Sequence, residues 1–179
     1  MLRFAFAALA TALLTGGASL AHAAEYPAGD PVMANGMEIA AVYLQPIEME
    51  PAGMMKPAAE TDIHLEADIH ATRDNTNGFA EGDWIPDLSI TFDLVSEDGS
   101  FKTSGSFMPM VASDGPHYGD NVKLGGEGKY TLTFHIAPPG THSHFGRHVD
   151  KETGVAAWFE PFDVTYQFVY AGTGKKGAY

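Results

Sequence analysis

Runs in which apolar and polar side chains alternate restrict the fold of this chain more than any other feature. Residues 62–70 alternate without exception, with apolar side chains at the odd positions and acidic residues or histidines at the even ones. A period of two sends successive side chains to opposite faces of an extended strand, whereas a helix repeats its apolar face every three or four positions. This segment therefore predicts a β-strand.

Further segments have the composition of strands, and glycine or proline lies at almost every junction between them. They are found at residues 37–44, 88–94, 101–111, 130–136 and 164–170. The turn Glu97-Asp98-Gly99 predicts a hairpin between the second and third of these segments. No convincing long amphipathic helix is present. Several short strands without an internal repeat are typical of an antiparallel sandwich or barrel.

The expected fold class is all-β, and at this length an immunoglobulin-like antiparallel β-sandwich is the commonest architecture. We expect a single domain at residues 24–170 and a flexible C-terminal tail at residues 171–179. Residues 1–23 have the pattern of a cleaved signal peptide, with a positive start, an apolar stretch and small residues at the cleavage site. The apolar stretch is too short to span a bilayer. We therefore expect an exported, periplasmic protein with no direct membrane insertion.

The charge balance bears on the partners of the protein. Ten lysines and arginines oppose 23 aspartates and glutamates, for a formal net charge of −13. Such a surface repels phosphate backbones and attracts cations or a basic partner, so we expect no nucleic acid ligand. The alternative is that the charge serves solubility alone. The chain contains no cysteine, so its stability must come from packing, hydrogen bonds or metal rather than disulfides.

Candidate metal ligands occur in three separate segments. His64 and Glu66 lie on one face of the predicted strand, roughly 6 to 7 Å apart, so they could share an ion. The alternative is the solvated outer face of a half-buried sheet. Around the Asp-Gly-Pro turn, Met110, Asp114 and His117 offer a soft sulfur, a carboxylate and an imidazole. Sulfur and imidazole together suit copper, although Met110 could equally fill a gap in the core.

The third segment is rich in histidine. His142, His144 and His148 fall within seven positions, after the prolines at 138 and 139. Spacing of this kind is a compositional indication of metal binding, and exposed polar residues are the alternative. His135 lies on the polar side of its strand, and we expect it at the surface.

Six segments closely resemble the periplasmic iron-transport proteins that bind copper and work with an inner-membrane iron permease. The resemblance covers residues 35–170 and rests on the motifs "EIAAVYLQPIEMEP", "DIHLEADIHA", "NGFAEGDWIPDLSI", "FMPMVASDGPHYG" and "RHVDKETGV" followed by "WFEPFDVTYQFVY". It implies an immunoglobulin-like sandwich that forms a homodimer, with a copper site near the subunit interface.

The resemblance also implies the ligands. Its motifs place the copper ligands at His64, Glu66, Met110, His117 and His148. An iron ion, with manganese or zinc as substitutes, is implied beside the copper, with Glu66 and Asp114 as the matching carboxylates. The loop after Pro139 departs from the family pattern through the extra His142 and His144, so His144 is the alternative to His148.

The expected function is metal binding in high-affinity iron uptake rather than enzymatic turnover. One alternative is a copper-dependent ferrous iron oxidase. Another is a periplasmic copper carrier, suggested by Met49, Met54 and Met55 together with the histidine loop. A superoxide dismutase is disfavoured, because the chain lacks a disulfide and a His-x-His copper strand.

Overall fold

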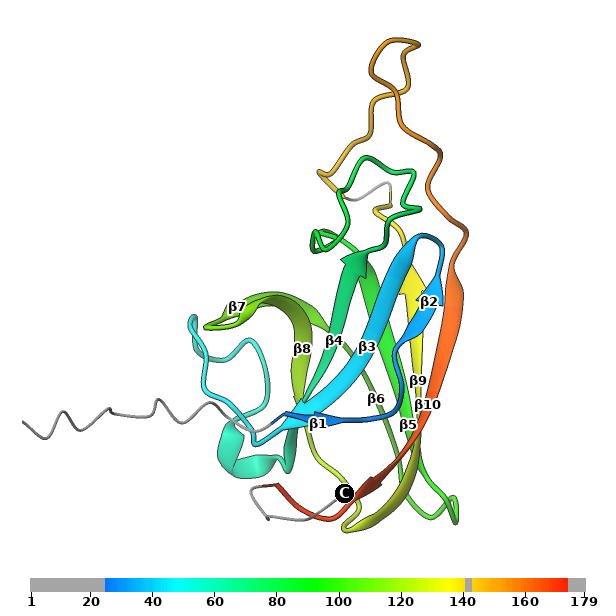
Figure 1. The fold of residues 1–179 in the computed structure, drawn as a ribbon. Helices are drawn as coiled ribbons and strands as arrows, with labels where there is room; N and C mark the ends of the chain where they lie inside the picture. The colour runs from blue at the N-terminus through cyan, green and yellow to red at the C-terminus, as the bar shows by residue number, and fades with distance from the viewer. Residues whose placement is uncertain (1–24, 141–142, 174–179) are drawn as a thin grey trace, which may run out of the picture.

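The alternating segments form two antiparallel sheets in the computed structural model, which describes residues 25–140 and 143–173 (Figure 1). The predicted all-β sandwich is confirmed, and the one helical element of the described residues is a 3-10 turn at Ala58–Glu60. The predicted signal peptide, His142 and residues 174–179 of the predicted tail lie outside the described residues. No helix of the described residues is long and apolar enough to cross a membrane.

The first sheet has the strand order β1-β3-β4-β8-β7, and β2 also pairs with β3. Its strands are β1 (Tyr26–Pro27), β2 (Val32–Ala34), β3 (Met37–Leu44), β4 (Ile63–Ala71), β7 (Met108–Ala112) and β8 (Gly115–Val122). The second sheet has the order β10-β9-β5-β6. Its strands are β5 (Ser89–Ser96), β6 (Lys102–Ser106), β9 (Gly128–Ala137) and β10 (Phe162–Tyr170).

The core lies between the two sheets. In β4 the apolar positions, such as Ile63, Leu65 and Ile69, are fully buried. The hydroxyl groups of two buried tyrosines form hydrogen bonds with other segments of the sandwich. A buried tyrosine needs such a bond to offset the desolvation of its hydroxyl group. Tyr166 of β10 donates to the Ile39 carbonyl of β3, over 2.8 Å. Tyr118 of β8 donates to a carbonyl and accepts an N–H from the segment that enters β5.

The predicted hairpin is confirmed in part. Strands β5 and β6 pair as expected, but the stretch predicted at residues 101–111 divides at Phe107, and β7 joins the first sheet. The reason is that Phe107 is buried and its N–H bonds to the Ile90 carbonyl, so the chain crosses the core there. Strand β8 was not predicted, because Pro116 and Gly119 reduce its β-propensity and the alternation is hard to recognise.

The connection between β9 and β10 extends beyond one end of the sandwich, at the top of Figure 1. It packs on the connection between β4 and β5: the Ala156 N–H bonds to the Thr76 carbonyl, and Phe145 stacks on Phe79. The predicted surface position of His135 is also observed, since its side chain is 39% exposed.

Candidate metal centre

Strands β4, β8 and β7 bring the candidate ligands together through their register. His64 of β4 lies opposite Asn121 of β8, and Glu66 lies opposite Gly119. On the other side of β8, His117 lies opposite Met110 of β7. Directly opposed residues in an antiparallel pair project to the same face, so donors far apart in sequence share one face of the sheet. Because the apolar positions of β4 fill the core, this is the face turned away from the second sheet.

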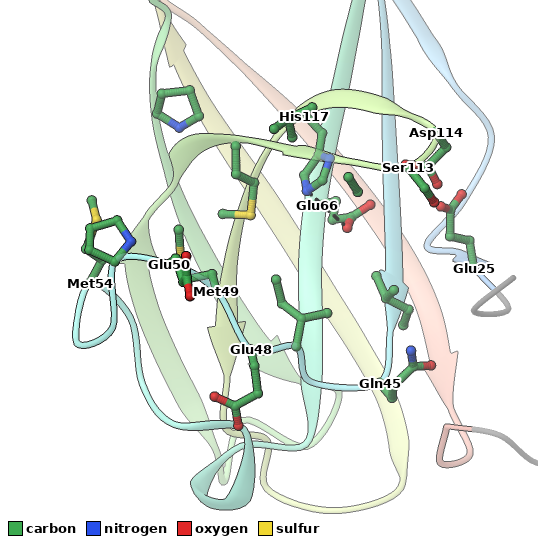
Figure 2. Close-up of a pocket in the computed structure, with 17 residues that line it drawn as sticks. Glu25, Gln45, Glu48, Met49, Glu50, Met54, Glu66, Ser113, Asp114 and His117 are labelled. Carbon is green, nitrogen blue, oxygen red and sulfur yellow. Dashed lines mark ion pairs between the residues drawn. The ribbon is translucent and has the colours of Figure 1, made fainter.

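This polar face is buried at its centre. The exposed fraction is 0% for His64 and 5% for both Glu66 and His117. The alternative prediction, a solvated outer face of a half-buried sheet, is therefore wrong for the positions of His64 and Glu66. The connection at residues 45–57 covers this part of the sheet and contributes to the wall of a cavity (Figure 2).

Two imidazoles converge on a single carboxylate oxygen. Glu66 Oε1 lies 3.5 Å from His64 Nε2 and 3.3 Å from His117 Nε2. One ligand atom from each of the three residues lies within 4.8 Å of the others. Neither contact is aligned as a hydrogen bond, and both Nε2 atoms are buried without a hydrogen-bond partner among the described residues. Buried polar atoms are rarely left unpaired, and a shared cation would satisfy both nitrogens.

Burial shifts the pKa values of His64 and Glu66. It lowers the pKa of His64 to about 4, against a smaller opposing effect of the Asn121 hydrogen bond, so this imidazole is neutral at pH 7. Burial also raises the pKa of Glu66 to about 8, and the nearby carboxylates of Asp68, Glu25 and Asp114 act in the same direction. A bound cation would lower the pKa of Glu66, because its positive charge stabilises the ionised carboxylate.

The cavity beside these residues has a volume of about 610 Å³. Met110 lines it together with Glu66 and His117, so a thioether, a carboxylate and an imidazole share one cavity wall. Gly119 keeps space open beside the cluster, because a Cβ atom there would lie 2.7 Å from His64 Nε2. Imidazole nitrogens and a soft sulfur fit copper better than calcium or magnesium.

A second, smaller cavity of about 180 Å³ adjoins the first and shares Glu66 and His117 with it. Glu25, Asp68 and Asp114 line it with His70, so it is rich in oxygen donors. Burial raises the pKa of Asp68, and it also raises that of Glu25, which in addition shares a hydrogen bond with Asp114. Grouped carboxylate oxygens are suited to a hard cation, whose charge offsets their mutual repulsion.

The structure does not bring His148 to this site within one chain. His148 lies in the β9–β10 connection with its side chain 74% exposed, and its Nδ1 lies 2.8 Å from the Thr153 hydroxyl. His144 is also exposed, and neither histidine lines the two cavities described above.

Sequence reasoning missed Asn121, Gly119 and Glu25. The spacing of His117, Gly119 and Asn121 is the period of a strand, and that signal could have placed all three on one face. Glu25 directly precedes β1 and reaches the site because it lies beside Asp114 in the β7–β8 turn (Figure 2), a contact that no local pattern indicates.

The fold and the site define a β-sandwich protein with a buried histidine and carboxylate centre suited to a metal ion. The chain belongs to the Fe2+ transport protein family, whose model matches residues 22–172. The resemblance noted from the sequence is thereby confirmed. A UPF0423 protein of Brucella abortus is 62% identical over 178 residues, which cover 98% of both proteins.

Two solved structures are similar over nearly their whole length. The copper-reconstituted P19 protein of Campylobacter jejuni is 57% identical, with a TM-score of 0.82, and the match covers 85% of this chain and 99% of that one. A copper-bound glutamate-to-glutamine variant of FetP, from uropathogenic Escherichia coli strain F11, is 59% identical, with a TM-score of 0.80 and coverage of 83% and 99%.

Proposed function

We propose that this protein binds copper and iron in the periplasm and delivers iron to an inner-membrane permease without catalytic turnover. The observation that carries the proposal is the pair of buried Nε2 atoms of His64 and His117 around one carboxylate oxygen of Glu66, neither of which has a hydrogen-bond partner in the described part of the chain. The family and the copper-bound relatives support the choice of metal. Residues 1–23 would direct export and then be removed.

Copper would be held by His64, His117, Met110 and Glu66. The imidazoles supply nitrogen donors, the thioether favours a soft ion, and Glu66 supplies negative charge once it has released its proton. The iron ion is the cargo. The oxygen-rich cavity around Asp114 adjoins Glu66, so this carboxylate could contact both ions.

A homodimer would complete the copper site. His148 is exposed on a connection that extends beyond the sandwich, and it cannot serve its own chain's cavity in the geometry described above. We propose that His148 reaches the copper of a second copy, with His144 as the alternative. A reciprocal exchange of this kind fits the two-fold symmetry of most homodimers.

Copper titration and iron-limited growth test the proposal together. His117→Ala and Met110→Leu should each weaken copper binding and impair growth on limiting iron, whereas the surface variant His135→Ala should do neither. Normal copper binding and normal growth with both site variants would refute the function.

A periplasmic copper carrier is the second candidate. It is favoured by the position of Met49 and Met54, which line the same cavity as Met110 (Figure 2). Thioethers are suitable ligands for cuprous copper. A deletion strain that is sensitive to excess copper but grows normally on limiting iron would favour this function. Stopped-flow turnover of ferrous iron would instead favour a copper-dependent oxidase.

A further inference from the structure

Asn121 has a fixed orientation beside the metal centre. It is 1% exposed, and its side-chain nitrogen donates to the backbone carbonyls of Ile47, at 2.9 Å, and Lys56, at 3.0 Å. A carbonyl only accepts hydrogen bonds, so the amide atom that contacts these two carbonyls must be the nitrogen, and the other atom of the amide must be the oxygen.

The Asn121 oxygen determines which nitrogen of His64 carries the proton. It accepts the Ile47 N–H at 3.2 Å and lies 3.0 Å from His64 Nδ1. An amide oxygen has no proton to donate, so Nδ1 must be the protonated nitrogen. In a neutral imidazole this leaves the lone pair on Nε2, the atom that faces Glu66 without a hydrogen-bond partner.

Ile47 and Lys56 are also the two ends of one loop. Between them, Met49 and Met54 line the cavity of the metal centre (Figure 2). The same amide therefore closes the base of this loop with three hydrogen bonds and contacts the His64 ring with its oxygen.

We propose that Asn121 is a positioning residue that couples the metal centre to the loop at residues 47–56. It presents His64 Nε2 to the metal and holds the loop against the cavity. The inference rests on the proposed copper binding and adds how the site is prepared and closed. Because coupling is reciprocal, copper at His64 stabilises the loop, and a loosened loop weakens copper binding.

Two variants separate the two roles. Asn121→Ala removes every contact, whereas Asn121→Asp keeps an oxygen for the His64 Nδ1–H but has no N–H for the two carbonyls. Asn77→Ala is the matched control for loop exchange and for the His64 tautomer, because Asn77 also donates to two backbone carbonyls, but those of Ala156 and Ala157, which lie outside the loop at residues 47–56.

The ring nitrogens of His64 are observed by nitrogen-15 NMR, and exchange of the loop amides by mass spectrometry. The unaltered, metal-free protein should show the Nδ1–H form of His64, and copper should slow exchange of residues 47–56. In Asn121→Ala we expect mixed tautomers, about tenfold faster loop exchange that copper no longer slows, and copper binding weakened by roughly 10- to 100-fold. Asn121→Asp should keep the Nδ1–H tautomer of His64 but speed exchange of the loop amides. Asn77→Ala should change neither the tautomer nor the loop exchange.

An Nε2–H tautomer in the unaltered protein would overturn the inference, and this measurement needs no variant to fold. Unchanged loop exchange in Asn121→Ala, in a protein that binds copper, would also overturn it. A protein that binds no copper at all would instead refute the proposed function, since the metal-free readouts do not depend on it.

Discussion

Replacing Gly119 with alanine is expected to destroy the metal centre while the sandwich still folds. The new Cβ atom would lie 2.7 Å from His64 Nε2, 3.0 Å from His64 Cε1 and 3.1 Å from the Leu65 carbonyl oxygen. The carbonyl belongs to a paired strand, and the His64 ring is fully buried and held by Asn121. The methyl group therefore occupies the approach to the nitrogen that would bind the metal.

The two effects have different sizes. Forcing a methyl group into a packed site costs about 1–3 kcal/mol of folding free energy. For a chain of this size each kcal/mol lowers the Tm by roughly 2–4 °C. A metal–imidazole bond needs about 2 Å of free approach, so copper affinity should fall by more than the roughly 100-fold loss typical of changes around a ligand.

Copper titration and thermal melts on the same samples test this prediction. Gly105→Ala is the matched control, because its Cβ would lie 2.8 Å from Phe92 Cε1, on the second sheet. The control should lose a similar Tm but bind copper as the unaltered protein does. Unchanged copper affinity in Gly119→Ala would refute the role of His64 Nε2 as a ligand.

Four further predictions have defined outcomes. Copper affinity should rise with pH up to about 8 and then level off, because Glu66 must release its proton, and Glu66→Gln should remove that rise. The folded pKa of Glu66, about 8, lies above its ordinary 4.5, so the stability that this group contributes to the metal-free protein falls as pH rises towards 8 and is lost above it. Melts at pH 6.5 and pH 9 would show the loss, because the lowered pKa of His64 acts in the opposite direction only below pH 6.5. Tyr118→Phe leaves two backbone groups unpaired and should cost about 1–3 kcal/mol in denaturant unfolding, with copper affinity retained. Asp163→Asn should lower the raised pKa of His135, measured by NMR titration, because its carboxylate is the main cause of that shift.

Local pattern was sufficient for much of the fold. Strict alternation predicted β4, and the same period predicted β5, β9 and β10, because the side-chain period of a strand is a property of the backbone alone. It did not predict β8, where proline and glycine interrupt the pattern, or the crossing at Phe107 between sheets.

The sequence by itself determined which donors were available: imidazoles, a thioether and carboxylates, in segments with the period of strands. Only the tertiary structure decided that His64 and Glu66 are buried on a polar face, and that Asn121, 57 residues from His64, fixes the tautomer of that histidine. Burial and tautomer depend on strand register and on the loop at residues 47–56, and both are set by contacts between distant residues. No local pattern contains that information.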